Sequence, residues 1–199
     1  MKLPLFPLHT VLFPGGVLPL RIFEQRYVTM VKSRLAEANS FGICLITAGD
    51  EVMRNTDVGQ SAPEIARIGT FASVLEWDMP QLGILHVVVQ AQQRFAVERQ
   101  SVAADGLMTG EVSAIPAEPQ RTIAEAFTPL VRLLEVLAPR VGAQQFPAEH
   151  RWNDASWVGY RLAELLPLPS SAKQSMLEIN DSEVRLTVIK QFLEDRGVL

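Results

Sequence analysis

The distribution of apolar and polar residues divides this chain into two parts with different periodicity. In residues 3–115, apolar residues gather in short runs separated by turn residues, which is typical of β-strands. Beyond the proline-bounded segment 116–119, apolar residues recur every three or four positions, which is typical of amphipathic helices. The change in period predicts an α+β protein with a β-rich part over residues 1–117 and a helical part over residues 118–199.

The β-rich part is predicted to contain six strands and one helix. The strands are expected at residues 3–8, 17–22, 41–47, 65–77, 84–98 and 107–115. The fourth and fifth strands form a hairpin around a tip at residues 78–83, and residues 49–64 form a polar loop. Apolar residues at helical spacing between Phe23 and Ala38 predict the helix. Several strands are apolar on both faces, and a small closed β-barrel with one covering helix accounts for that pattern.

The first apolar stretch carries no charge over residues 3–20, which approaches the length of a membrane span. It contains Pro4, Pro7, Pro14 and Pro19, each of which would remove a helical hydrogen bond and clash with the preceding turn. We therefore expect no membrane span and no signal peptide here. The stretch predicts two edge strands joined by a turn at residues 13–16, whose sequence is Phe-Pro-Gly-Gly.

The helical part is predicted from its capping residues. Thr122 and Glu125 have the spacing of a capping box, and Pro129 is expected to kink the helix that follows or to restart it. Asp154 and Asp181 are expected to cap two later helices. Ser171 is expected to begin a short capped helix between them.

Composition narrows the classes of partner and location. The 199 residues include 18 basic and 22 acidic ones, a net charge of −4, and no run of Lys or Arg. Nucleic-acid binding depends on a basic face, so the sequence gives it no support. Cys44 is the only cysteine and lies in an apolar run, where we expect a buried, unreactive thiol. A protein without disulfides is typical of a reducing, cytoplasmic location.

The sequence offers no convincing reaction centre, so we predict no enzyme activity, no metal and no cofactor. No glycine precedes a lysine, which excludes a P-loop. The three histidines are far apart, without metal-ligand spacing. Ser170 and Lys173 resemble a nucleophile–base pair, but at a helix start the lysine is expected to be solvated and protonated. Glu76 and Asp78 flank a hairpin tip, where water favours solubilising charges over acid–base catalysis.

Apolar residues at two predicted turns stand out as candidate binding residues. They are Phe13, Pro14, Trp77, Met79, Pro80 and Leu82. Clustered apolar residues at exposed turns are typical of partner-binding surfaces. The alternative is that both turns fold back over the barrel as a lid, and the sequence leaves these two interpretations open.

Several sequence blocks resemble one known family. The blocks are PLFPLHTVLFPGGVLPLRIFEQRY, FGICLI, IGTFASVLEW, QRFAVE and LAELLPLPSSAKQSMLEINDSEVRL. In this order they resemble the N-terminal substrate-binding domain of the Lon ATP-dependent proteases, from about Leu3 to Phe192. The form of the first block is most similar to stand-alone bacterial proteins that consist of this domain only. One departure is Ala91, where the family often has glycine.

The resemblance implies a PUA-like β-barrel followed by a helical bundle, and it implies recognition of polypeptides. Partners would be unfolded polypeptides or partner proteins, with a protease acting in trans as a further candidate. Without the ATPase and peptidase modules of Lon proteases, such a chain would bind but not cleave. The sequence does not predict an oligomeric state.

Two alternatives remain beside polypeptide binding. PUA-like barrels also bind RNA, which here would need a contiguous basic surface built from residues such as Arg21, Arg26, Arg67 and Arg94. A small-molecule receptor would need an enclosed pocket with convergent polar groups.

Four further residues are expected to be structural. Glu24 and Arg26 fit a buried ion pair or cap, and Trp152 and Trp157 fit the core of the helical bundle.

Overall fold

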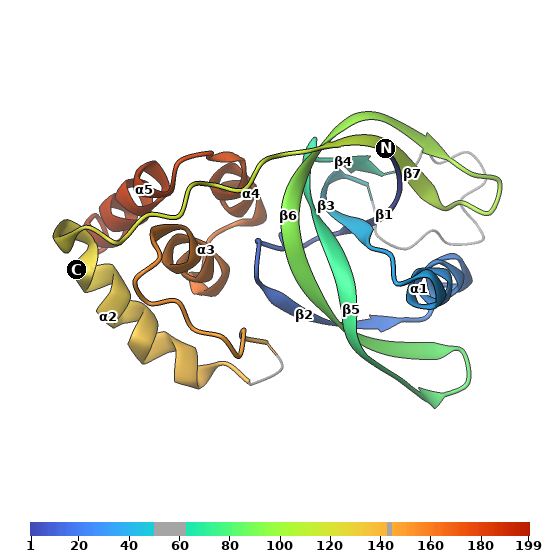
Figure 1. Ribbon diagram of the computed structural model, residues 1–199, viewed down its shortest axis with the longest axis horizontal. Coiled ribbons are helices and arrows are strands. Elements are labelled where there is room, and N and C mark those ends of the chain that lie inside the picture. Colours follow the sequence, from blue (N-terminus) through green and yellow to red (C-terminus); the bar gives the residue numbers. More distant parts are fainter. Residues whose placement is uncertain (50–62, 143–144) are drawn as a thin grey trace.

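The strands and most of the helices occupy opposite sides of the molecule, as Figure 1 shows for the computed structural model. The structure describes residues 1–49, 63–142 and 145–199. The strands are β1 (Lys2–Leu8), β2 (Val17–Ile22), β3 (Phe41–Ala48), β4 (Glu64–Ile65), β5 (Ile68–Gln81), β6 (Ile84–Val102) and β7 (Met108–Ala114). The predicted loop at 49–64 lies largely outside the described residues, and its last residue, Glu64, belongs to β4.

Five strands close into a ring in the order β1-β7-β6-β5-β3, and β3 returns to β1 by parallel pairing. The other two strands pair outside this ring, β2 with β6 and β4 with β3. The predicted small barrel is therefore a closed sheet ring with two attached strands. The long β6 makes this possible, because residues 85–90 pair with β2 while residues 95–102 pair with β7.

Apolar side chains fill the ring from inside, which explains why the strands are apolar on both faces. Phe95 and Phe71 meet there with ring centroids 4.8 Å apart. The helix α1 (Gln25–Glu37) covers a second cluster, in which Tyr27 stacks on Phe6 at 4.2 Å. The predicted covering helix is thus present. It begins at Gln25 because Glu24 has extended backbone geometry, and Phe23 remains outside it.

The β5–β6 hairpin is longer than predicted. Strand pairing continues from Asp78, opposite His86, to Gln81, opposite Ile84. The turn is therefore Leu82-Gly83 rather than residues 78–83, and the positive φ of Gly83 (+84°) suits such a tight turn.

The remaining helices form a bundle beside the ring. The α-helices are α2 (Thr128–Leu137), α3 (Ala155–Leu165), α4 (Ser170–Glu178) and α5 (Ser182–Glu194), and the short 3-10 helices are η1 (Glu125–Phe127) and η2 (Ala138–Arg140). None of the helices among the described residues is both long enough and apolar enough to cross a bilayer.

The bundle confirms two of the predicted caps and contradicts two others. Asp154 and Asp181 each accept two backbone N–H groups at the start of α3 and α5. The predicted capping box of Thr122 is wrong, because Thr122 forms a β-bridge with Asp154 and no side chain caps η1. Pro129 lies in the first turn of α2, so it restarts the helix as predicted. No side chain caps α4, where Pro169 occupies the N-cap.

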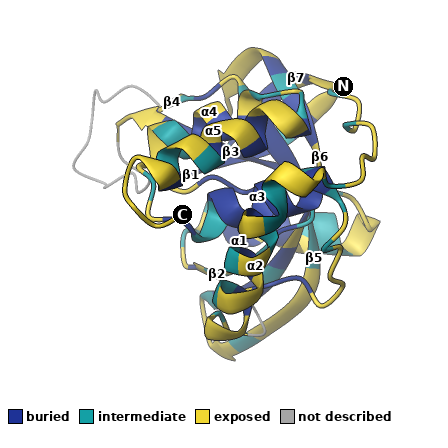
Figure 2. Ribbon diagram, turned by 90° about the vertical axis from the view of Figure 1, so that its left-hand side faces the viewer, coloured by how far each residue is buried: buried dark blue, intermediate teal, exposed yellow. Residues whose placement is uncertain are grey.

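One apolar core joins the bundle to the ring. It contains Leu130, Val158 and Leu186 from the helices together with Val11 and Phe13 from the β-rich part. Figure 2 shows the buried central helix α3 between the more exposed α2 and α5. We propose that the boundary at residues 117 and 118 is a division of chain topology, because this core extends across it.

The turn at residues 13–16 is part of that shared core. Phe13 is fully buried, and its ring centroid lies 5.7 Å from that of Tyr160 on α3. Gly15 has a φ of +74°, and a Cβ on Gly16 would lie 2.2 Å from Glu164 Oε1. The two glycines are therefore required by the turn geometry and by the close approach of α3.

Candidate binding cleft

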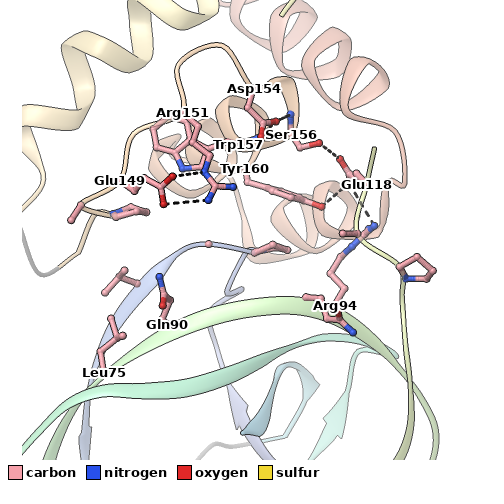
Figure 3. Close-up of a pocket in the computed structure, with 18 residues that line it drawn as sticks. Leu75, Gln90, Arg94, Glu118, Glu149, Arg151, Asp154, Ser156, Trp157 and Tyr160 are labelled. Carbon is pink, nitrogen blue, oxygen red and sulfur yellow. Dashed lines mark hydrogen bonds and ion pairs between the residues drawn. The ribbon is translucent and has the colours of Figure 1, made fainter. Parts of the chain in front are cut away.

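A cleft of about 450 Å³ lies between the ring and the bundle (Figure 3). Its ring side comes from the turn at residues 13–16 and from β2, β5 and β6. Its bundle side comes from the linker at residues 116–118, from residues 147–154 and from the first turns of α3. The lining residues are Pro14, Gly15, Val17, Leu75, Gln90, Gln93, Arg94, Pro116, Ala117, Glu118, Pro147, Ala148, Glu149, Arg151, Asp154, Ser156, Trp157 and Tyr160.

The cleft combines an aromatic wall with an apolar edge. Trp157 and Tyr160 project from α3 because Asp154 caps that helix and fixes its start. Leu75 on β5 is 51% exposed and faces this wall across the cleft. Gln90 extends into the space between them (Figure 3). Such a surface suits an apolar group with a hydrogen-bonding backbone.

One carboxylate, Glu118, organises the deep side of the cleft. Its side chain is only 4% exposed. It accepts hydrogen bonds from Ser156 Oγ at 2.7 Å, from the Tyr160 hydroxyl at 2.6 Å and from both terminal nitrogens of Arg185. Arg94 Nη2 lies 3.5 Å away. The linker is thereby fixed to β6, α3 and α5 at one point.

The electrostatics of this network keep Glu118 ionised. Burial alone would raise the pKa of its carboxyl group, but the hydrogen bonds from Arg185, Tyr160 and Ser156 outweigh burial and lower it. Burial also raises the pKa of Tyr160, whose hydroxyl therefore remains a proton donor to Glu118. Arg185 completes the arrangement by stacking over the Tyr160 ring at 4.0 Å.

A second buried ion pair lies behind the turn at residues 13–16. Arg161 Nη2 donates to Glu164 Oε1 at 2.8 Å and to the Pro14 carbonyl at 3.0 Å. Burial raises the pKa of Glu164 to about 7, although Arg161 and Lys173 oppose that change. Neither Arg161 nor Glu164 lines the cleft, so this pair holds the turn against α3 and does not face a ligand there.

The exposed rim carries one more ion pair. Arg151 donates to Glu149 through Nε and Nη2, at 3.1 and 3.2 Å. These bonds lower the pKa of Glu149. Because both side chains are exposed, the pair can open at little cost and does not close the cleft.

The predicted binding residues are in two different environments. Phe13 is buried in the shared core and Pro14 is half-buried at the cleft, so of the two interpretations that the sequence left open, an exposed turn does not hold for Phe13. Trp77 and Leu82 are 59% and 95% exposed on the β5–β6 hairpin, where Pro80 is also exposed. Met79 is half-buried and packs on the cluster beneath α1. The structure does not bring the two sets together.

The predictions for residues outside the candidate binding set and the helix caps are correct except for one. Arg26 pairs with Glu24 at 2.8 Å, and Trp157 is buried in the bundle core with Trp152 packed against it. Cys44 is buried, which raises the pKa of its thiol to about 12. Lys173 is half-buried rather than solvated, and its Nζ donates to the Glu164 carbonyl at 2.6 Å. Ser170 donates to the His9 carbonyl.

The sequence did not single out Leu75, Glu118 or Tyr160 as cleft residues. Their neighbours in the cleft are distant in the sequence, so no local pattern marks them. The only available signal was the proline-bounded linker around Glu118. Within the described residues, no three His, Cys, Asp or Glu side chains cluster as a metal site would require.

The structure is that of a small α+β domain suited to binding. It consists of a closed strand ring and a helical bundle packed on it, with an open apolar cleft between them. The chain belongs to the family of the ATP-dependent protease La (LON) substrate-binding domain, whose model matches residues 2–195.

Two solved structures and one sequence relative illustrate this similarity. The Lon N-terminal domain protein from Xanthomonas campestris superposes with a TM-score of 0.75 at 31% identity, covering 96% of this chain and 98% of that one. The N-terminal domain of the Mycobacterium avium complex Lon protease gives 0.64 at 16% identity, covering 98% and 99%, and shares the fold. The Lon protease of Amoebophilus asiaticus is 27% identical over 194 residues, which cover 93% of this chain and 22% of that protease.

Proposed function

We propose that this protein is a non-catalytic polypeptide-binding module, which holds apolar segments of unfolded or partner proteins in the cleft between ring and bundle. The exposed side of the β5–β6 hairpin, with Trp77 and Leu82, adds apolar area beyond the cleft. Affinity is expected to be about micromolar, because a flexible partner loses conformational freedom when it binds.

The observation that carries this proposal is the combination of a fixed aromatic wall and an open mouth. Before any ligand arrives, Tyr160 is held by the Glu118 network and Trp157 by its packing in the shared core, so the wall needs no reorganisation on binding. Leu75 on the opposite side is exposed although it is apolar. An apolar edge that faces a prearranged wall is suited to binding the side chains of a polypeptide. The open cleft does not enclose a catalytic group away from water.

The same proposal extends to activity, partner, location and the type of the ring. The module acts without ATPase or peptidase activity of its own, and a protease acting in trans is a candidate partner. A reducing, cytoplasmic location is supported by the single buried Cys44. The strand ring is of the PUA-like type.

The test is titration of a fluorescently labelled unfolded polypeptide with this protein, read by anisotropy. Leu75→Ser should weaken binding about five- to tenfold, because it removes apolar area at the cleft. Val184→Ser on α5 is the matched control, since Val184 is similarly exposed but lies outside the cleft. Wild-type affinity for Leu75→Ser would reject the cleft as the site, and no binding by wild type would reject the function.

Two of the four arginines named for the RNA alternative bind groups within the protein. Arg94 is buried and donates to the Leu177 and Ile179 carbonyls, and Arg26 donates to Glu24 and to the Gly106 carbonyl. These two arginines therefore cannot join Arg21 and Arg67 in an open basic surface. Salt-dependent retention on RNA would revive this alternative.

The small-molecule alternative has one observation in its favour. The cleft volume falls within the range of ligand pockets. Binding of a small ligand stabilises the folded state, so a shift in the thermal midpoint with a metabolite mixture would support it.

A further inference from the structure

A second hollow continues the cleft along the same three strands. This hollow, called the outer groove below, has a volume of about 400 Å³ and lies on β2, β5 and β6. On β6, Gln90 lines the cleft and Val88 lines the outer groove. On β5, Leu75 lines the cleft and Glu76 lines the outer groove. The two hollows therefore lie end to end over the outer face of the sheet.

Strand register orders the side chains of the outer groove into two rows. Pro19, Val88 and Glu76 stand opposite one another across β2, β6 and β5. The next row, toward the hairpin tip, contains Arg21, His86 and Asp78. Alternation along a strand places both rows on the face opposite to the buried Val87 and Val89.

The outer groove carries an excess of negative charge. Glu76 and Asp78 are exposed, and among the described residues neither carboxylate forms an ion pair. Asp78 Oδ1 accepts a local hydrogen bond from the Met79 amide. Arg21, at the opposite edge of the groove, balances one of the two carboxylates. With a neutral His86, the groove therefore carries one net negative charge. Trp77 lies between the two carboxylates on β5 and pairs with Val87, so alternation directs its side chain to the other face of the sheet.

We propose that the cleft and the outer groove bind one extended polypeptide segment, with an apolar residue in the cleft and a lysine or arginine four residues away, at Glu76 and Asp78. The spacing follows from β6, where His86, opposite Asp78, is four residues from Gln90, or about 13 Å along an extended strand. Glu76, opposite Val88, stands in the row between them. An even spacing puts both side chains of the segment on one face, whereas a spacing of three puts them on opposite faces.

The choice of a basic residue follows from charge complementarity. A lysine or arginine places its cationic group near Glu76 and Asp78 and its aliphatic stem on apolar surface such as Val88 and Pro19. A glutamate at the same place would meet like charge and lose affinity. This inference rests on the proposed function and specifies which polypeptides the module prefers.

The experiment compares labelled twelve-residue peptides that contain a leucine anchor in an otherwise Ser/Thr sequence. In the first series, lysine, serine or glutamate stands four residues from the leucine anchor. In a second series, the charged residue stands three residues from the anchor. Anisotropy at pH 7.5 should show lysine binding about three- to tenfold tighter than glutamate at a spacing of four. The preference for lysine over glutamate should fall below twofold when the spacing is three residues. It should also fall below twofold at a spacing of four when the buffer contains 0.5 M NaCl.

Protein variants then assign the preference to the groove. The double variant Glu76→Gln/Asp78→Asn should lose the lysine preference while retaining binding through leucine. Its matched control is Glu98→Gln/Asp105→Asn, which removes two exposed carboxylates elsewhere, one of which likewise accepts a local amide hydrogen bond. Circular dichroism checks that both variants are folded, and the spacing series on wild type tests the proposal without any variant.

The outcomes separate this inference from the function on which it rests. Leucine-dependent binding with equal affinity for lysine and glutamate would overturn the inference and leave the polypeptide-binding function standing. Absence of leucine-dependent binding for every peptide would overturn both. A lysine preference that survives Glu76→Gln/Asp78→Asn would place the basic residue elsewhere and also overturn the inference.

Discussion

The turn at residues 13–16 and the hairpin tip at residues 77–83 have similar sequence character but different surroundings. Each combines large apolar side chains with proline and glycine at a strand connection. Phe13 is buried against Tyr160, whereas Leu82 is 95% exposed. The difference arises because α3 packs over the first turn, while the β5–β6 hairpin extends away from the bundle (Figure 1).

This comparison shows that an apolar turn is not in itself a binding surface. The first turn has glycines that permit close approach, and α3 supplies Arg161 and Glu164 to satisfy the Pro14 carbonyl and the backbone of Phe13. The hairpin tip has no comparable partner among the described helices. Burial and satisfied backbone groups therefore distinguish a structural turn from a candidate contact surface.

The largest expected effect comes from removing the helices that cover the first turn. Truncation to residues 1–117 exposes Val11, Phe13 and Leu45, which now lie in the shared core. The fragment should lack a cooperative thermal transition and should aggregate. Truncation after Glu194 is the control and should unfold cooperatively. A cooperative transition of the 1–117 fragment near the midpoint of the full chain would show that the ring folds independently.

A matched pair of alanine variants tests the comparison directly. Phe13→Ala should lower the free energy of unfolding by about 3–5 kcal/mol, because it leaves a cavity in the shared core. Leu82→Ala should change it by less than about 0.5 kcal/mol, because the side chain is exposed. Denaturant titration measures both. Equal losses would mean that the two turns do not differ as the structure shows.

Local features of the fold were predictable from sequence, and long-range ones were not. Asp154 and Asp181 were recognised as caps because a cap and the amide groups it accepts lie within three residues. The strand and helix periods were likewise visible in the spacing of apolar residues. The burial of Phe13 was left open by the sequence, because it depends on Tyr160, which is distant in the chain.

The same reasoning applies to the cleft. The partners of Glu118 include Arg94, Tyr160 and Arg185, which are too far apart in the sequence to fall within one local pattern. Leu75 becomes a cleft residue only when the bundle stands opposite β5. The family resemblance predicted the fold, which the structure confirms. It also implied polypeptides as the class of ligand, which stays a prediction, and it did not indicate where in the fold a ligand would bind.

The Glu118 network holds the bundle over the first turn, and its loss should be the next effect in size. Glu118→Gln leaves Arg94 and Arg185 buried without their carboxylate and should cost about 3 kcal/mol of stability. Glu111→Gln, at an exposed site on β7, is the control. A change below 1 kcal/mol in the free energy of unfolding would show that the network adds little to the docking of the bundle.

Glu164 should give the contact between turn and bundle a pH dependence. Burial raises its pKa from the ordinary value of 4.5 to about 7, so the folded state binds the proton more tightly than the unfolded state. The resulting stabilisation is fully present below pH 4.5 and is lost as the pH rises through 7, with at most about 3 kcal/mol involved. The stability of Glu164→Gln should therefore vary less than that of wild type between pH 5 and pH 8. Parallel stability curves for the two proteins would contradict this assignment.

The smallest effect on stability, and an informative one for binding, is expected at the hairpin tip. Trp77→Ser combined with Leu82→Ser removes two exposed apolar side chains and should leave the free energy of unfolding within about 1 kcal/mol of wild type. If the tip contacts partners, the same change should weaken binding of an unfolded polypeptide about two- to fivefold, because residues at the edge of an interface contribute little each. Unchanged anisotropy titrations alongside a weakened Leu75→Ser would confine recognition to the cleft and make the exposed tip a feature of the fold alone.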